Sequence, residues 1–200
     1  MDDNSKIIIK EEASDKKFGI YLIVSGLIAW IASGILVLDR LALYKNPNHV
    51  TSCDINPWVS CGTVMKSWQA ELLGFPNPLI GIVGFAIITA IGFALLAGAK
   101  FAKWFWISLQ IGITLALGFI VWLISQALYD IQALCLYCMI VWAVVIPLFI
   151  NTFSKILDNR SILAPAGLVK VVREWKIPVS IILIATVGAL IVLKFPNAFF

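Results

Sequence analysis

Long apolar stretches alternate with shorter polar segments along the chain. Five of them approach or exceed the roughly 20 helical residues that cross a hydrocarbon core of about 30 Å. These stretches cover residues 18–38, 79–99, 104–128, 133–153 and, somewhat shorter, 177–193. Because backbone N–H and C=O groups in lipid must find partners within their own segment, we expect each stretch to form an α-helix.

Composition supports a membrane protein. Apolar residues make up 61% of the 200 residues and charged residues 13%, and the mean hydropathy is +0.97. A soluble domain usually has about 45–50% apolar and about 25% charged residues. The net charge of +4 is small and scattered, so it gives no indication of nucleic-acid binding. We expect an all-α, polytopic fold, in which a four-helix transmembrane bundle is joined by a fifth transmembrane helix.

Basic residues are distributed unevenly between the two sides of the expected spans. One side carries 11 Lys and Arg residues, in segments 1–17, 100–103 and 155–176, and the other side carries four. The side richer in Lys and Arg usually faces the cytoplasm, so the N-terminus is expected there. The resulting division is a cytoplasmic tail (1–17), the four-helix domain (18–154), a cytoplasmic linker (155–176), and the fifth helix with a short extracytoplasmic tail (177–200).

The longest extracytoplasmic segment covers about residues 39–77. Within it, residues 59–73 have the pattern of a short amphipathic helix. Ser60 stands where an N-cap is needed. The expected apolar face consists of Cys61, Val64, Trp68 and Leu72. We expect this helix to lie on the membrane surface and to cap the bundle.

The chain has four cysteines, and all of them fall on the extracytoplasmic side of this topology. Cys53 and Cys61 lie in the long loop, whereas Cys135 and Cys138 form a C-x-x-C at the start of the fourth helix. That side is the oxidising one, where disulfides persist. The helix dipole favours the thiolate of an exposed Cys135, and Cys138 lies one turn deeper, within reach of a lipid-soluble electron acceptor. A mobile loop pair and a fixed membrane pair in series suit thiol–disulfide exchange.

Two other interpretations of the cysteines are open. They could form two static disulfides, Cys53–Cys61 and Cys135–Cys138, although C-x-x-C pairs are more often redox-active than structural. They could also form a four-cysteine zinc site, although the interval of seven residues between the loop cysteines is wide for a zinc knuckle. We favour redox-active cysteines and expect no metal. A relay would pass through more than one of the three possible pairings.

Two polar residues complete a recognisable pattern. Ser67 follows Cys61 by six residues, and Asn77 stands between two prolines directly before the second span. Together with the two cysteine pairs, these residues resemble the vitamin K epoxide reductase (VKOR) family. Its members have a first-loop cysteine pair, a Ser or Thr shortly afterwards, an Asn at the start of the second helix and a C-x-x-C in the fourth. The resemblance covers about residues 18–153.

The resemblance implies a four-helix bundle around a quinone, with a relay of electrons through the cysteines. Cys53 would exchange with a reduced partner protein, and Cys61 would attack Cys135. Cys138 would face the quinone. The loop pair would thus be a shuttle that re-forms its disulfide in each cycle.

The resemblance also implies which residues bind the quinone. Ser67 and Asn77 would form hydrogen bonds near its carbonyl groups, and Trp142 stands four residues after Cys138, where the family has a tyrosine. Each residue has a simpler interpretation as well. Ser67 could be a solvated helix residue, Asn77 an N-cap and Trp142 a packing residue. No thioredoxin-like domain follows the fifth helix, so the partner is expected to be a separate protein.

We therefore expect a quinone-dependent thiol–disulfide oxidoreductase in a bacterial cytoplasmic membrane, with its site on the extracytoplasmic face. It would be a monomer, would oxidise a thioredoxin-like or DsbA-like partner, and would reduce menaquinone, ubiquinone or phylloquinone. An alternative with related chemistry is the reduction of vitamin K epoxide, as in animal relatives. Another is a structural or transport protein with inert disulfides, although no span interior contains Asp, Glu, Lys or Arg that would serve ion coupling.

Overall fold

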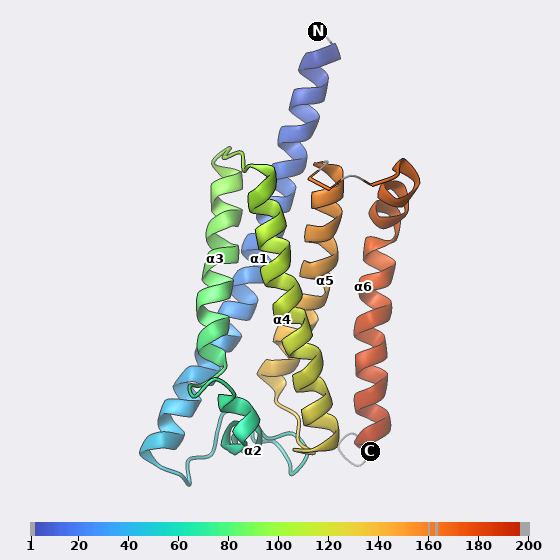
Figure 1. Ribbon diagram of the computed structural model, residues 1–200. Coiled ribbons are helices and arrows are strands. Elements are labelled where there is room, and N and C mark those ends of the chain that lie inside the picture. Colours follow the sequence, from blue (N-terminus) through green and yellow to red (C-terminus); the bar gives the residue numbers. More distant parts are fainter. Residues whose placement is uncertain (1–2, 160, 163, 197–200) are drawn as a thin grey trace.

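The computed structural model describes residues 3–159, 161–162 and 164–196, and within them the regular secondary structure is helical. Five helices are long and apolar enough to cross a membrane. The helices are α1 (Asp3–Lys45), α2 (Cys61–Lys66), the 3-10 turn η1 (Trp68–Glu71), α3 (Pro78–Leu96), α4 (Lys103–Tyr129), α5 (Leu136–Asp158) and α6 (Ala166–Lys194) (Figure 1). The expected all-α, polytopic membrane fold is confirmed.

The bundle consists of α1, α3, α4 and α5, and α6 packs beside α5 at its edge (Figure 1). α1 and α3 approach each other closely because glycines face across their interface. A Cβ atom at Gly92 would lie 2.7 Å from the carbonyl oxygen of Gly19, and one at Gly19 would lie 2.9 Å from that of Gly92. The two backbones therefore meet directly, as small residues allow in membrane helices.

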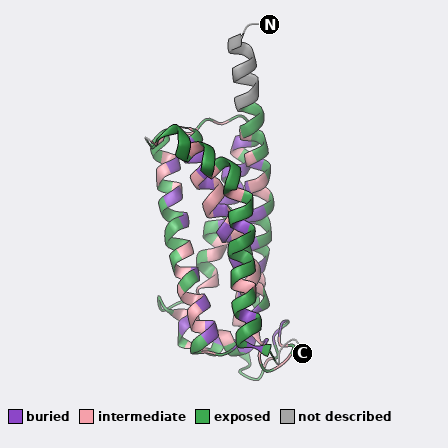
Figure 2. Ribbon diagram, turned by 90° about the vertical axis from the view of Figure 1, so that its right-hand side faces the viewer, coloured by how far each residue is buried: buried purple, intermediate pink, exposed green. Residues whose placement is uncertain are grey.

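Apolar side chains cover the outward faces of the long helices. In Figure 2, α6, which faces the viewer, is mostly exposed, whereas the helices behind it carry more buried residues. Leu115 and Val121 of α4 and Ile181 of α6 are among the exposed apolar residues. Lipid tails are as apolar as leucine, so such a surface is stable in a bilayer.

Two helices extend well beyond the apolar stretches that predicted them. α1 begins at Asp3 rather than near residue 18, and α6 begins at Ala166 rather than near residue 177. The turns added to α1 are largely polar, whereas those added to α6 mix charged residues with apolar ones such as Leu168 and Val171. A helix propagates more easily than it nucleates, so it continues into such residues once the apolar part has formed. Much of the expected tail and linker is therefore helical.

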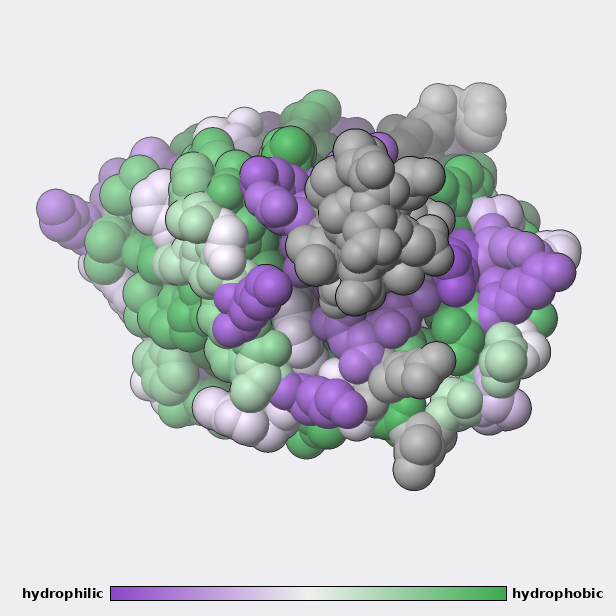
Figure 3. Space-filling model, turned by 90° about the horizontal axis from the view of Figure 1, so that it is seen from above, coloured by the Kyte–Doolittle hydropathy of each residue, from purple (hydrophilic) through white to green (hydrophobic). Residues whose placement is uncertain are grey.

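The two ends of the bundle differ in character. The end that carries the N-terminus presents a group of hydrophilic side chains (Figure 3). Lys100 and Lys103 belong to this end because they lie where α3 connects to α4, and both are exposed. The opposite end carries α2, η1 and the start of α5, and therefore the cysteines.

The loop helix expected over residues 59–73 is interrupted. α2 ends before Ser67, which has extended backbone angles (φ −76°, ψ 152°), and η1 starts after it. The carbonyl oxygen of Val64 accepts hydrogen bonds from both the N–H (3.2 Å) and the hydroxyl (2.7 Å) of Ser67, which ends α2 in a tight turn. The prediction of one continuous helix was therefore wrong. Trp68 and Leu72 are exposed rather than part of a buried face.

Candidate functional site

Cys53 and Cys61 form a disulfide at the start of α2, with a Cα–Cα separation of 5.5 Å. Both side chains are buried. Cys61 is the first residue of α2, and Ser60 is its N-cap, whose hydroxyl oxygen accepts a hydrogen bond from the N–H of Thr63 (3.1 Å). The predicted capping role of Ser60 is confirmed. The loop pair is thus fixed at the first turn of a short helix.

Asp54 holds the loop around this disulfide. Its carboxylate accepts hydrogen bonds from the N–H groups of Thr51 (2.7 Å) and Gly62 (2.9 Å) and from the hydroxyl of Ser60 (2.7 Å). Partial burial raises the pKa of Asp54, but these bonds to the ionised form outweigh burial, and the net pKa is lowered. A carboxylate therefore clamps both sides of the segment between the two cysteines.

A short parallel bridge joins this loop to the start of α5. Val59 and Leu134 are its paired residues. The N–H of Ser60 donates to the carbonyl oxygen of Leu134 (2.9 Å), and the N–H of Leu134 donates to the carbonyl oxygen of Trp58 (2.7 Å). Cys61 and Cys135 follow the bridge closely on the two segments that it joins. The bridge therefore sets the register that brings the two cysteines together.

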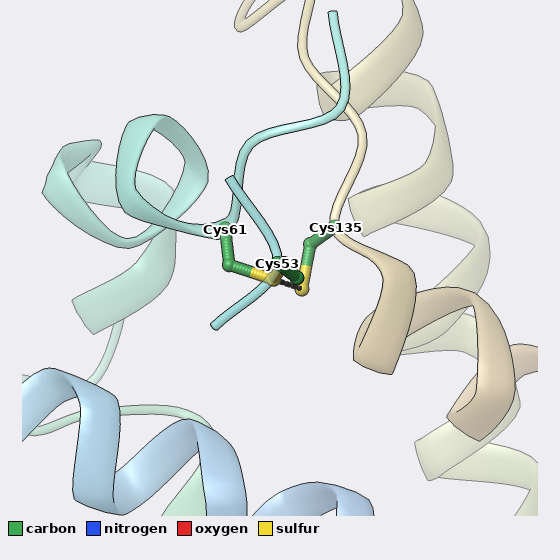
Figure 4. A group of neighbouring side chains, drawn as sticks. All are labelled: Cys53, Cys61 and Cys135. Atoms are coloured by element: carbon green, nitrogen blue, oxygen red, sulfur yellow. Dashed lines mark hydrogen bonds between the residues drawn. A yellow bond between two sulfur atoms is a disulfide. The ribbon is translucent and has the colours of Figure 1, made fainter. Parts of the chain in front are cut away.

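The sulfur atoms of Cys61 and Cys135 lie 3.1 Å apart (Figure 4). Cys135 is the N-cap of α5, and its sulfur accepts a hydrogen bond from the N–H of Cys138 (3.3 Å). Cys135 and Cys138 are both free thiols. The expectation that Cys135 is exposed was wrong, since the side chain is only 2% exposed. The bridged loop and its disulfide cover it.

Three of the sulfurs, those of Cys53, Cys61 and Cys135, lie within 4.8 Å of one another. Such a cluster could in principle hold a metal ion, but metal ions bind cysteine as thiolate. Two of the three sulfurs are bonded to each other and cannot supply one. In the disulfide state, the described residues of this cluster therefore suit thiol–disulfide exchange rather than zinc binding.

A cavity of about 430 Å³ lies inside the bundle, next to Cys135 and Cys138. Its walls come from α1, α3, α4, α5 and the α2–η1 segment, and nearly all of the lining is apolar. Cys135 and Cys138 form part of the wall, as do Ser67, Asn77 and Trp142. The structure thus brings together around one cavity the second cysteine pair and the three residues that the sequence suggested for ligand binding.

The polar groups on this wall are few. The hydroxyl of Ser67 is already used within its own turn. Asn77 occupies the N-cap position of α3, but its side chain makes no capping hydrogen bond. Its Nδ2 atom donates instead to the carbonyl oxygen of Gln69 (2.6 Å), and its Oδ1 atom is buried without a partner among the described residues. Trp142 is 5% exposed and packs in the apolar core while it borders the cavity.

Two residues of the site were not recognised from the sequence. Gln69 is 2% exposed and borders the cavity. Arg40 also borders the cavity, and it pairs with Glu71 (Nε–Oε1, 3.1 Å) while donating to the carbonyl oxygen of Met65. An isolated Gln and an Arg at a span end carry no distinctive pattern, so the sequence offered no signal for either.

The fold and the site define a class of protein. A helical membrane bundle carries one cysteine disulfide in contact with a second cysteine pair, beside an apolar cavity within the bundle, which is the arrangement of a membrane redox enzyme. The family model of the vitamin K epoxide reductase family matches residues 20–153, well over half of the chain, so the protein belongs to that family. A comparison with curated proteins found no match.

Proposed function

We propose that this protein oxidises the dithiol of a thioredoxin-like partner and passes the electrons through its four cysteines to a lipid quinone. The single observation that carries this proposal is the 3.1 Å separation between the sulfurs of Cys61 and Cys135. Thiol–disulfide exchange requires the attacking sulfur to reach one sulfur of the disulfide. That contact links the loop pair to the pair at the cavity.

The first step regenerates the loop dithiol. A thiolate of the partner attacks the sulfur of Cys53, the Cys53–Cys61 bond breaks, and Cys61 leaves as a thiolate. The second thiol of the partner then attacks the mixed disulfide, so the partner is oxidised and the loop pair carries two electrons. Because Cys53 is 1% exposed, the loop before α2 must open for this attack.

The second step moves the electrons to the fourth transmembrane segment. The Cys61 thiolate attacks Cys135 within a Cys135–Cys138 disulfide, and Cys138 leaves as a thiolate. Cys53 then attacks Cys61, which restores the loop disulfide and releases Cys135. The product is an oxidised loop pair with a reduced second pair, which is the pairing in this structure. In the proposed cycle it is the state that precedes quinone reduction.

A quinone in the cavity supplies an acceptor for two electrons and two protons. The cavity suits such a group because its lining is nearly all apolar, as an aromatic ring with a hydrocarbon tail requires. Cys138 borders the cavity and delivers the electrons as its disulfide with Cys135 re-forms. Ser67 and Asn77 orient the ring, and Trp142 packs against it. The cavity extends between α3 and α4 past Gly84 and Gly112, where an isoprenoid tail fits.

The cellular setting forms part of the same proposal. The distribution of basic residues supports a cytoplasmic N-terminus and an extracytoplasmic site, in a bacterial cytoplasmic membrane. The domain division follows, with the catalytic bundle in residues 18–154, flanked by cytoplasmic residues 1–17 and 155–176, and with residues 177–200 as an added helix and tail. The protein acts as a monomer on a separate DsbA-like partner. Menaquinone, ubiquinone and phylloquinone all combine a ring with two carbonyls and an isoprenoid tail.

The test uses the purified full chain in lipid nanodiscs, a reduced thioredoxin-like donor and a soluble ubiquinone analogue. The unmodified protein should oxidise the donor and reduce the quinone in equal amounts. Cys138→Ser should abolish quinone reduction, and Cys53→Ser should accumulate a Cys61–Cys135 disulfide that mass spectrometry of non-reduced peptides detects. Ser125→Ala, on a residue that bonds only within α4, is the matched control.

Two results would count against the proposal. Quinone turnover retained by Cys138→Ser would remove that residue from the last step. Absence of the Cys61–Cys135 species in Cys53→Ser, with donor oxidation intact, would exclude the relay. Turnover of vitamin K epoxide without oxidation of a protein donor would instead indicate the alternative reaction for which the family is named.

A further inference from the structure

Three polar side chains from separate parts of the sequence form a chain of hydrogen bonds beside the loop disulfide. The hydroxyl of Ser52 donates to Oδ2 of Asp39 (2.9 Å), and its oxygen lies 3.2 Å from the hydroxyl oxygen of Tyr137. An ionised carboxylate can only accept, so the single hydroxyl proton of Ser52 is used toward Asp39. The hydroxyl of Tyr137 must therefore donate to Ser52. The chain runs in one direction, from Tyr137 through Ser52 to Asp39.

This chain ties the loop to two transmembrane helices at the cysteines themselves. Asp39 lies near the end of α1, Ser52 directly precedes Cys53, and Tyr137 stands inside the C-x-x-C, in the first turn of α5. The ring of Tyr137 packs against the buried cluster that contains the loop disulfide. The chain therefore holds the loop on the N-terminal side of Cys53, whereas Asp54 holds it on the C-terminal side.

Side chains in this loop alternate between outward and inward positions. Val50, Ser52 and Ile55 are exposed, whereas Thr51 is 4% exposed and Cys53 is 1% exposed. Thiol–disulfide exchange requires direct access of the attacking thiolate to a sulfur of the disulfide. A dissolved thiol has no such access while the loop is closed. Because Ser52 adjoins Cys53, opening the loop there separates Ser52 from Tyr137.

We infer that the hydrogen-bond chain Tyr137–Ser52–Asp39 is a latch that makes the loop disulfide selective for a protein dithiol over small thiols. The inference rests on the proposed function, because it concerns the partner that reduces the loop. A small thiol must wait for the loop to open by itself, and the latch makes the open state rarer. Ser52 and Tyr137 are positioning residues, since they act by holding the loop and take no part in the exchange of sulfurs.

A protein partner has a way to open the loop that a small thiol lacks. Val50 is 72% exposed and Ile55 is 69% exposed, and these two apolar side chains stand on either side of Cys53 in the sequence. A partner with an apolar surface around its own dithiol contacts them while the loop is closed. The free energy of that contact then offsets the hydrogen bonds that are lost when the loop opens.

The chemical step is the same for both kinds of reductant. A thiolate of the dithiol attacks Cys53, the Cys53–Cys61 bond breaks, and Cys61 leaves as a thiolate. The second thiol of the reductant then displaces Cys53, so the reductant becomes a disulfide and the loop pair gains two electrons. Substitutions in the latch leave this chemistry unchanged. The ratio of the rates with the two reductants therefore measures access to Cys53.

The experiment uses the full chain in lipid nanodiscs with Cys135→Ser and Cys138→Ser, in which the loop disulfide is the one that can form. Its reduction by dithiothreitol and by reduced thioredoxin is followed by alkylation and mass spectrometry. Tyr137→Phe keeps the packed ring and removes the donor. It should speed reduction by dithiothreitol about fivefold and reduction by thioredoxin less than about twofold, as expected for loss of one hydrogen bond. Ser52→Ala should have the same selective effect.

Three further variants separate the latch from a general loosening of the loop. Asp39→Asn keeps an oxygen that accepts from Ser52, so its rates should stay close to those of the parent protein. Ile55→Ser should slow thioredoxin about fivefold, because apolar contact is lost, and should leave the rate with dithiothreitol unchanged. Tyr129→Phe is the matched control, since it removes the hydroxyl of an exposed tyrosine at the same end of the bundle. The melting temperature of each variant is measured alongside.

The outcomes distinguish the inference from the proposed function. Unchanged rates with dithiothreitol in both Tyr137→Phe and Ser52→Ala overturn the inference alone, as does equal acceleration of both reductants. If thioredoxin fails to reduce the loop disulfide of the parent protein while dithiothreitol succeeds, oxidation of a thioredoxin-like partner fails as the proposed function. The inferred selectivity for a protein dithiol then fails with it.

Discussion

The backbone N–H of Ser60 donates a 2.9 Å hydrogen bond to the carbonyl oxygen of Leu134, and each residue stands immediately before a cysteine. This bond aligns two segments that are far apart in the chain, so that Cys61 and Cys135 start their helices side by side. The proximity of their sulfurs is therefore a property of the backbone and not only of side-chain rotamers. Changes to the bridge should separate the cysteines without altering either one.

Leu134→Pro should test this directly. Proline lacks the N–H that donates to Trp58 (2.7 Å) and restricts the preceding residue as well. In a Cys53→Ser background, the yield of the Cys61–Cys135 disulfide should fall by about tenfold. This is the effect expected when one buried hydrogen bond is lost and the two segments no longer align in the same register. Val50→Pro, at an exposed position of the same loop, should leave the yield unchanged. An unaltered yield in Leu134→Pro would show that the bridge does not set the register.

Asp54 should control how readily the loop opens. Asp54→Ala removes these three hydrogen bonds and should destabilise the closed loop by on the order of 1 kcal/mol. This value lies at the low end of the range for hydrogen bonds to a charged group, because the carboxylate is partly exposed. Reduction of the Cys53–Cys61 disulfide by a phosphine at neutral pH should then be about fivefold faster. Asp158→Asn, at the far end of the bundle, is the control.

The same residue predicts a pH dependence. The folded-state pKa of Asp54 is lowered below its ordinary value of 3.8, so its contribution to loop stability is fully present above that pH and declines as the pH falls through the folded value. The phosphine reduction rate of the unmodified protein should therefore approach that of Asp54→Ala only below pH 3.8. A constant ratio of the two rates across this range would contradict the prediction.

The Arg40–Glu71 pair should stabilise the cap of the bundle. Two guanidinium nitrogens of Arg40 contact Oε1 of Glu71 (Nε 3.1 Å, Nη2 2.5 Å), and the Arg40 side chain is 12% exposed. Glu71→Gln leaves a largely buried cation without its counter-charge, which should cost about 2 kcal/mol and lower the melting temperature in detergent by about 4–8 °C. Glu174→Gln, on an exposed face of α6, should have no effect. Arg40→Leu combined with Glu71→Leu should be less harmful than the two single changes added together.

Gly112 should determine which quinone tails fit. It borders the cavity, and a Cβ atom there would meet no atom within 4 Å. Gly112→Trp should fold, fill the space between α3 and α4, and raise KM for a long-chain quinone by about tenfold while sparing a tail-less one, as expected for lost burial of a few methylene groups. Gly118→Trp, on the outer face of α4, is the matched control. An equal rise in KM for both quinones would place the tail elsewhere.

Sidedness should be tested with introduced cysteines, because Cys53, Cys61 and Cys135 are buried and would react poorly even if correctly oriented. In a cysteine-free variant, Val50→Cys should react with a membrane-impermeant maleimide in sealed cells, since Val50 is 72% exposed in the loop that we propose to be extracytoplasmic. Lys103→Cys, at the opposite end, should react only after lysis. The reverse pattern would invert the topology.

Much of the fold could be predicted from the sequence, since apolar length alone locates five spans and a serine before Cys61 locates an N-cap. The helix ends were harder to predict, because α1 extends into largely polar residues and α6 into a mixed segment, neither of which forms a continuous apolar stretch. The break at Ser67 was missed because it depends on a local feature, the two hydrogen bonds that its hydroxyl and N–H both donate to the carbonyl oxygen of Val64.

The sequence identified most residues of the site but did not predict how they are arranged in space. The cysteines and Asn77 stand at recognisable spacings, whereas the burial of Cys135 depends on a backbone bridge between residues 59 and 134. Such long-range pairing leaves no periodic trace in either segment. The same holds for Gln69, whose partners Gln126 and Asp130 lie on another helix.

The direct contact between the backbones of α1 and α3 limits how the cavity can change. Gly19 and Gly92 leave no space for the helices to move closer, and separating them would break their direct backbone contact. The α3 wall of the cavity is therefore stiff, whereas α4 meets α3 across the cavity itself. Adaptation to a ligand of another size must be absorbed by α4 and by the cap. Over evolutionary time, substitutions that change ligand preference should accumulate in α4, while the residues at the α1–α3 interface stay the same.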